Sequence, residues 1–309
     1  MKSYHIPVLL KASVDGLNII PDGTYADVTF GGGGHSREIL NRLRDGRLIA
    51  FDHDLDAEQN APDDPRLLFL RQNFIYLKNN LKYLGITEID GLIADLGVSS
   101  YQFDSAERGF SFRMKGPLDM RMNKDAELSA ADLIRKYPEE KLLSLFKEFG
   151  EIKNSGKLCD SIIKYRKQTE ITLIEVFLDA ISPCIPVRNK HKYLAKVFQA
   201  LRIEVNKELE GLKKLLIQCE DVIREGGRMV ILTYHSLEDR LVKNFIRYGN
   251  FKPVVETDFF GNKLSPFEAV NRKVIVPDLE EVNHNPRAKS AKLRIAKRCI
   301  RTDHNGKQD

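Results

Sequence analysis

Short apolar runs alternate with helix-like patterns over the first third of the chain. The apolar runs predict buried strands at 23–30, 47–52, 66–70 and 90–98. Between them, residues 36–44 and 75–85 carry apolar side chains at the three- and four-residue spacing of one helix face. Strands that alternate with helices predict an α/β domain built on a doubly wound, mostly parallel sheet.

The next strand pattern comes much later, at 227–235, and the stretch before it is helical. Ser129 with Asp132 three residues on forms a capping-box pattern at the start of one helix. Further helices are predicted at 138–150, 155–168 and 172–182. A parallel sheet needs no connection this long, so the stretch indicates a helical insertion.

The insertion sets the expected domain organisation. We expect an all-helical domain at 122–205, inserted into an α/β domain that is made of residues 1–121 and 206–309. A single long helix that starts at Tyr193 and stops at Gly226-Gly227 is expected to lead the chain back to the sheet.

Composition narrows the class of protein. Hydrophobic residues make up 42% and charged residues 30% of the 309 residues, as in soluble globular proteins. No apolar run reaches the roughly 20 residues of a membrane helix, and the N-terminal residues lack the pattern of a signal peptide. A cytoplasmic protein is therefore expected. The four cysteines form no C-x-x-C pair, which argues against a zinc site and predicts reduced thiols.

The excess positive charge is concentrated at one end of the chain. Residues 285–309 hold eight Lys or Arg and two Asp, a net charge of +6, whereas the whole chain carries only +5. Such a segment favours a polyanionic partner such as nucleic acid, and a solvated basic tail is the alternative.

A run of four glycines, Gly31–Gly34, separates the first strand from the helix that follows. A ligand at a strand-to-helix turn approaches the backbone most closely where side chains are missing. Asp52 ends the second predicted strand, where a carboxylate accepts the hydroxyls of an adenosine ribose. Ser36 stands where the dinucleotide fingerprint has its third glycine, so the pattern favours S-adenosylmethionine over a nicotinamide dinucleotide.

Several longer motifs resemble the MraW/RsmH family, bacterial methyltransferases that modify the exocyclic N4 of a cytosine in the decoding region of small-subunit ribosomal RNA. In the first half of the chain they are "HIPVLL" (5–10), "DVTFGGGGHS" (27–36), "FDHDLDA" (51–57), "DGLIADLGVSSYQFD" (90–104) and "RGFSFRMKGPLDMRM" (108–122). In the second half they are "FQALRIEVNKEL" (198–209), "HSLEDRLVK" (235–243) and "NPRAKSAKLR" (285–294). The resemblance implies the fold of class I S-adenosylmethionine methyltransferases and that cofactor.

The resemblance also implies the cofactor contacts. They fall on Gly33, Gly34, His35, Asp52, Phe74, Asp95 and Gln102. The glycines and His35 would contact the methionine side, Asp52 would hold the ribose and Phe74 would flank the adenine. For His35 we expect a cofactor contact and no role as general base.

Methyl transfer is an in-line displacement, so the enzyme mainly aligns the nucleophile with the methyl group. The amino lone pair of cytosine is delocalised into the ring, and acceptors that hold the amino protons would help. Many amino methyltransferases place Asn or Asp followed by Pro-Pro-aromatic after strand four, where this chain has Asp95-Leu96-Gly97-Val98. Asp95 would serve cofactor, substrate or both; a turn-capping Asp is the alternative.

The other catalytic candidates are His235, Ser236 and Asp119. In "HSLEDR", His235 or Ser236 would contact the target base. The alternative is structural: Ser236 with Asp239 would form a capping box, and Glu238 with Arg240 would be surface charge.

Two basic stretches are candidates for RNA contact. In the first, Arg108 and Arg121 stand among aromatic residues, which suits phosphate contacts and base stacking, with buried ion pairs as the alternative. In the second, the residues are Arg287, Lys289, Lys292 and Arg294; the alternation in "AKLRIAKR" (291–298) predicts a strand with one charged face, which would hold Lys292 and Arg294. Lys289 stands where Arg is common in the family, and "HKYLAKV" (191–197) departs from the family's usual run there.

Three readings of function thus stand beside one another. The first is an S-adenosylmethionine-dependent rRNA (cytosine-N4)-methyltransferase whose partner is small-subunit rRNA, within an assembled or assembling subunit. The second is a methyltransferase that acts on another nucleic-acid amino group, DNA included. The third is a catalytically silent RNA-binding assembly factor, against which stand the intact glycine loop, Asp52 and Asp95.

Overall fold

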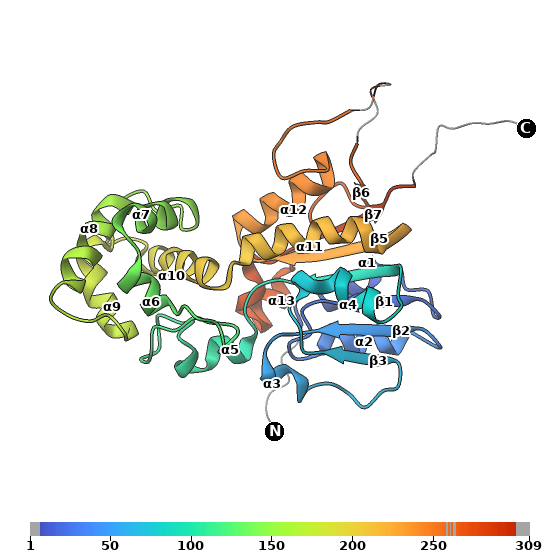
Figure 1. Cartoon of the computed structure of the whole chain (residues 1–309), viewed down its shortest axis with the longest axis horizontal. Helices are drawn as coiled ribbons and strands as arrows, with labels where there is room; N and C mark the ends of the chain where they lie inside the picture. Colours follow the sequence, from blue (N-terminus) through green and yellow to red (C-terminus); the bar gives the residue numbers. More distant parts are fainter. Residues whose placement is uncertain (1–6, 258, 260, 262–263, 301–309) are drawn as a thin grey trace, which may run out of the picture. The chain divides into compact units, whose positions relative to one another are not determined.

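The computed structural model describes residues 7–257, 259, 261 and 264–300. The chain divides into two compact units (Figure 1). The sheet unit takes the residues up to Gly97 and from Gly211 onward, and the helical unit takes Val98–Glu210. Among the described residues, no helix is long and apolar enough to cross a membrane.

The sheet unit is built on seven strands in the order β3-β2-β1-β4-β5-β7-β6. Their bounds are β1 Thr24–Asp27, β2 Arg47–Phe51, β3 Leu67–Leu70, β4 Ile89–Asp95, β5 Ile223–Thr233, β6 Phe267–Ala269 and β7 Lys292–Arg298. The first five pair in parallel, and β7 pairs antiparallel with both β5 and β6. The chain winds outward in both directions from β1 and β4, which confirms the expected doubly wound, mostly parallel sheet.

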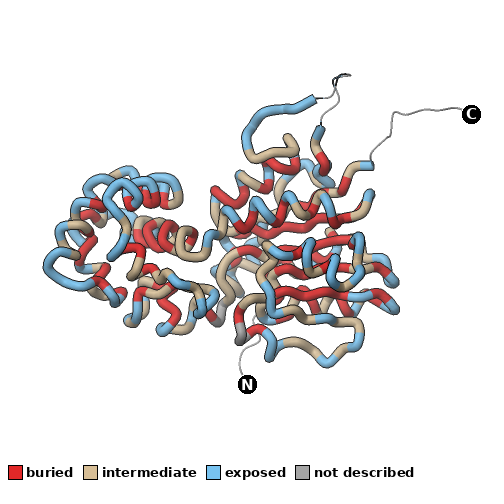
Figure 2. The backbone as a smooth tube through the Cα atoms, viewed as in Figure 1, coloured by how far each residue is buried: buried red, intermediate tan, exposed pale blue. Residues whose placement is uncertain are grey.

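Helices cover both faces of this sheet. They are α1 Leu10–Leu17, α2 Gly34–Arg42, α3 Leu55–Glu58, η1 Phe74–Tyr76, α4 Leu77–Tyr83, α12 Ser236–Tyr248, α13 Leu279–His284 and η4 Pro286–Ser290, with most of α11 Glu208–Val222. Successive strand residues point to opposite faces: Leu92 packs in one apolar cluster with α4, α11 and α12, and Ile93 packs in another with α1 and α2. Two covered faces explain why the strands read as continuous apolar runs, which appear as buried in Figure 2.

The third predicted strand is less buried than expected. β3 forms the sheet edge and leaves Leu68 41% exposed. An edge position depends on strand order, which an apolar run does not specify.

The prediction of a single long helix from Tyr193 is wrong. The structure has α10 Lys190–Asn206 and then α11, separated by Lys207, whose φ of 51° is left-handed. Lys207 caps α10, because its backbone N–H donates to the carbonyls of Ile203 and Glu204, and the Nδ2 of Asn206 donates to the carbonyl of Arg202. Gly226 and Gly227 lie inside β5, which begins at Ile223 directly after the helix.

The helical unit has its own core. Its remaining helices are α5 Ser100–Asp104, η2 Ala106–Arg108, α6 Ala130–Lys136, α7 Glu139–Glu148, α8 Ser155–Arg166, α9 Ile174–Ile181 and η3 Ser182–Cys184. The predicted capping box is confirmed at α6, where Ser129 and Asp132 exchange hydrogen bonds. The unit is longer than the expected 122–205 segment, because Phe110 and Leu118 are buried in the same core as the helices.

Candidate active site

The four glycines differ in what surrounds them. Gly31 and Gly33 have left-handed φ values of 52° and 73°. A Cβ on Gly32 would meet nothing within 4 Å, and one on Gly31 only a carbonyl oxygen at 3.9 Å. In contrast, a Cβ on Gly33 would lie 2.6 Å from Phe30, and one on Gly34 2.0 Å from Pro7. The first two glycines leave bare backbone beside open space, whereas the last two permit close packing within the protein.

Asp52 fastens the glycine loop to the end of β2. Its carboxylate accepts hydrogen bonds from the backbone N–H groups of Gly31 and Asp54, both at 2.8 Å. Burial raises the pKa of Asp52, and these two hydrogen bonds lower it in part. Each oxygen accepts one backbone N–H, so lone pairs remain for the hydroxyl groups of a ligand.

Asp27, which the sequence did not single out as a site residue, fixes the loop from its other side. Its side chain is buried at the end of β1 and accepts the hydroxyl of Ser36 at 2.6 Å and the N–H of Thr29 at 3.1 Å. Burial raises the pKa of Asp27. The strand end and the helix start are thus tied together through one carboxylate.

His35 is buried at the first turn of α2. Burial lowers the pKa of its imidazole, which is therefore neutral at pH 7. Its Nδ1 lies 3.8 Å from the Asp95 carboxylate, and its Nε2 has no hydrogen-bond partner in the described part of the chain. A buried donor or acceptor without a partner costs free energy, so a hydrogen bond to this atom would stabilise the protein.

Asp95 ends β4 and meets a residue that the sequence analysis missed. The Tyr234 hydroxyl donates to the Asp95 carboxylate at 2.7 Å, and the Asp95 N–H donates to Thr29 Oγ1 at 2.6 Å. Burial, and to a smaller extent the charge of Glu238, raises the pKa of Asp95 to about 7. Tyr234 reads as the end of an apolar strand, and only its place beside "HSLEDR" pointed to the site.

The motif "HSLEDR" begins α12, but its cap differs from the expected one. The capping box joins His235 with Glu238, and Ser236 is the first residue of the helix and is exposed. Glu238 is 2% exposed and accepts the N–H of Tyr234 at 2.9 Å, so it is no surface charge. The expected pair of Ser236 with Asp239 is therefore wrong as the cap.

These residues lie at the carboxyl ends of the parallel strands. The glycine loop follows β1, Asp52 follows β2, Phe74 follows β3, Asp95 ends β4 and Tyr234 follows β5. In an open α/β sheet, ligands bind beyond the carboxyl ends of the strands. The carboxylates and the bare loop thus form one site that suits a ligand with hydroxyl groups.

Comparison with known proteins identifies the family. The sequence profile of the MraW methylase family matches residues 2–299. The chain belongs to the MraW methylase family. It is 57% identical to the "Ribosomal RNA small subunit methyltransferase H" of Bacteroides thetaiotaomicron, over 96% of this chain and 98% of that protein. It is 51% identical to the protein of the same name from Cytophaga hutchinsonii, over 96% and 99%.

The remaining candidates of this MraW methylase belong partly to the helical unit. Gln102 is buried in α5 and accepts the N–H of Ser99 at 3.2 Å. Arg108 is 3% exposed and donates to the carbonyls of Arg121 and Met122. Asp119 and Arg121 form a two-point ion pair, with both N···O distances 2.8 Å.

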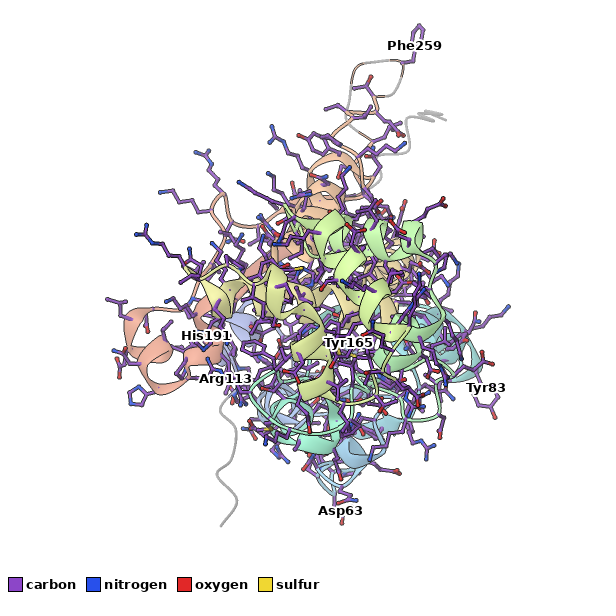
Figure 3. All side chains as sticks on the ribbon, turned by 90° about the vertical axis from the view of Figure 1, so that its left-hand side faces the viewer. Asp63, Tyr83, Arg113, Tyr165, His191 and Phe259 are labelled. Atoms are coloured by element: carbon purple, nitrogen blue, oxygen red, sulfur yellow. The ribbon has the colours of Figure 1, made fainter. Side chains whose placement is uncertain are left out.

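The helical unit also has two exposed residues that can carry positive charge, His191 and Arg113. The ring of His191, near the start of α10, lies 6.1 Å from that of Phe112. His191 and Arg113, both labelled in Figure 3, are exposed. Phe110, in contrast, is 5% exposed and packs into the helical core.

The basic strand has its predicted charged face, but two of its cations are already paired. Lys292 and Arg294 on β7 contact the same carboxylate, Asp239, at 3.0 and 2.7 Å. Both cations lower the pKa of Asp239. Arg287 and Lys289 lie in η4 and are exposed.

Proposed function

We propose that this chain transfers a methyl group from S-adenosylmethionine to the exocyclic N4 of a cytosine in the decoding region of small-subunit ribosomal RNA. Membership of a methylase family supports the reaction class, and relatives named for the small-subunit ribosomal RNA support the substrate class. The observation that carries the proposal is the position of the Asp95 carboxylate, at the end of β4 and beside the glycine loop.

The residues of the sheet unit fit the cofactor. Gly31 and Gly32 leave room against the backbone, and Asp52 has acceptor capacity for two ribose hydroxyls. Gly33, Gly34 and His35 lie at the start of α2 and are proposed to contact the methionine end, whose carboxylate is suited to the free amides of a helix start. Phe74 would flank the adenine and Gln102 would complete the contacts. When bound, the cofactor supplies the electrophilic methyl group.

Asp95 is the residue that we assign to the amino group. The N4 atom forms a bond to the methyl carbon, the carbon–sulfur bond breaks, and one amino proton must leave. A carboxylate that accepts a hydrogen bond from that amino group localises its lone pair and holds the departing proton. Because the pKa of Asp95 is about 7, the accepting form predominates above neutral pH. His235, Ser236 and Asp119 are proposed to position the base.

The basic residues are proposed to hold the RNA. Arg287 and Lys289 are exposed, and Arg121, Lys292 and Arg294 would have to contact phosphates while they keep their carboxylate partners. Arg108 is the least accessible of the proposed RNA contacts. We propose small-subunit rRNA as the partner, in an assembled or assembling subunit, and the cytoplasm as the place of action.

The test is transfer of labelled methyl from S-adenosylmethionine to unmodified small subunits and, separately, to their stripped RNA. Digested nucleosides are identified by mass and retention, with Asp95→Asn as the variant. N4-methylcytidine from the wild type and strongly reduced transfer by the variant are expected. A different methylated nucleoside would overturn the cytosine-N4 assignment, and RNA binding without any transfer would favour a silent assembly factor.

A further inference from the structure

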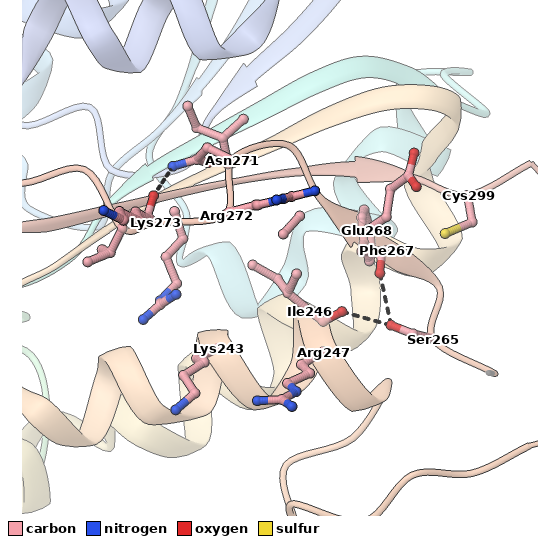
Figure 4. A pocket seen from close by; sticks show the side chains of 14 residues that line it. Lys243, Ile246, Arg247, Ser265, Phe267, Glu268, Asn271, Arg272, Lys273 and Cys299 are labelled. Atoms are coloured by element: carbon pink, nitrogen blue, oxygen red, sulfur yellow. Dashed lines mark hydrogen bonds between the residues drawn. The ribbon is translucent and has the colours of Figure 1, made fainter.

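A pocket of about 580 Å³ lies between α12 and the segment that joins β6 to β7 (Figure 4). Its lining includes five cationic side chains and one carboxylate: Lys243, Arg247, Arg272, Lys273, Arg294 and Glu268. Of these residues, only Arg294 was expected from the sequence to contact a ligand. The pocket lies wholly within the sheet unit.

Most of this positive charge is uncompensated. Among the described residues, no carboxylate lies within 4.0 Å of Lys243, Arg247, Arg272 or Lys273. The carboxylate of Glu268 lies 3.8 Å from Lys297, so it is shared with a further cation. All four cations are exposed, and the pocket therefore carries a net positive field that solvent can reach.

The arrangement is unfavourable for the protein alone. Lys243 and Arg247 stand four residues apart on α12, where like charges repel each other. Arg272 and Lys273 are adjacent in the chain, and Figure 4 shows them on the wall opposite the helix. A cluster of like charges on two facing walls is stabilised when an anion enters between them.

We propose that this pocket holds the sugar–phosphate backbone of the RNA substrate, at a point away from the methylated base. The proposal rests on the proposed function, because it assumes an RNA substrate. Helix α12 is capped by His235 at the site and rises 1.5 Å per residue, so Lys243 and Arg247 lie roughly 12 and 18 Å along the helix from this cap. The pocket would thus contact nucleotides that flank the target.

Exposure of the cations favours a polymer over a small anion. A single phosphate on exposed side chains stays hydrated and screened by salt. A polynucleotide presents several phosphates at once and releases its condensed counterions on binding. The pocket therefore adds affinity and register, with no contribution to cofactor binding.

The test measures RNA binding by the full chain without methyl transfer. The double variants Arg272→Gln/Lys273→Gln and Lys243→Gln/Arg247→Gln are titrated with a labelled, unmodified small-subunit rRNA fragment at several salt concentrations. Each double variant is expected to bind about 10-fold more weakly at physiological salt. The negative slope of log K against log salt is expected to become shallower by about 1.4, because each of the two lost phosphate contacts contributes about 0.7 for a single strand.

The matched control is Lys11→Gln/Lys82→Gln, which removes the same charge from exposed positions outside the pocket, on α1 and α4. Pocket variants that weaken binding no more than this control would overturn the proposal, as would equally effective competition by polyglutamate. Unchanged affinity for S-adenosylmethionine in all variants is expected. The two proposals can fail separately. If the wild type methylates a nucleoside other than cytidine and the pocket variants still lose RNA affinity, the cytosine-N4 function is overturned and the pocket assignment stands.

Discussion

Tyr234→Phe provides a direct test of Asp95 as the group that receives the amino proton. The change removes a single atom, the hydroxyl that donates to the Asp95 carboxylate at 2.7 Å. This hydrogen bond stabilises the ionised form and is the main contact that lowers the pKa of Asp95 against the effect of burial. Without it, the pKa of Asp95 must rise above its present value of about 7.

The size of the change follows from the strength of such bonds. A hydrogen bond to a charged group contributes about 1.5–3 kcal/mol, and one pKa unit corresponds to about 1.4 kcal/mol. The pKa of Asp95 should therefore rise by about 1–2 units, and by about 1 if water replaces the hydroxyl. Because transfer needs the carboxylate form, the acidic limb of the pH–rate profile should move upward by the same amount.

The assay is kcat/KM for methyl transfer, which reports the free enzyme, over roughly pH 6 to 10. Tyr25→Phe is the matched control, because its hydroxyl bonds to the Ile20 N–H and makes no hydrogen bond with Asp95. An acidic limb that stays in place in a folded Tyr234→Phe protein would refute the role of Asp95. An equal movement in both variants would show a general loss of packing instead.

Four further substitutions test cofactor binding and stability. Gly32→Ala should leave the midpoint of urea unfolding unchanged but weaken S-adenosylmethionine binding in calorimetry, whereas Gly34→Ala should lower the midpoint as well, because its Cβ would lie 2.0 Å from a proline carbon. Asp52→Asn should weaken cofactor binding about 10- to 100-fold, since a charged acceptor of the ribose is worth about 1.5–3 kcal/mol; unchanged affinity in a titration would contradict this. Lys207→Gly should raise the free energy of unfolding by up to about 1 kcal/mol relative to Lys207→Ala, because only glycine adopts a φ of 51° without strain.

Much of the fold could be predicted because local patterns specify it. Apolar runs bounded by polar residues indicated the strands, and the pattern of Ser129 with Asp132 marked a helix start. The break at Lys207 escaped prediction, because the apolar spacing continues through it and no glycine or proline marks the turn. A lysine in the left-handed region is stabilised by its surroundings and leaves no sign in the sequence.

The site residues that follow predicted strands could be identified from the sequence. Those whose role depends on contacts between distant parts of the chain could not. Asp52 could be named because it ends a predicted strand. Asp95 lies inside the predicted strand at 90–98 and was named through the family resemblance. Tyr234 was missed because an aromatic residue at the end of a strand usually belongs to the core. The ion pairs of Asp239 with Lys292 and Arg294 join residues more than fifty positions apart, so the strand's basic face seemed free.

The insertion of the helical unit between β4 and β5 has a consequence for the order of events during synthesis. These two strands are hydrogen-bonded neighbours, although 127 residues separate the end of one from the start of the other. The nascent chain therefore exposes four strands and completes the helical unit before the central partner of β4 leaves the ribosome. Local helical contacts form quickly, whereas sheet closure waits for distant segments. We expect an incomplete sheet with an unpaired β4 edge to be the species on which a chaperone acts.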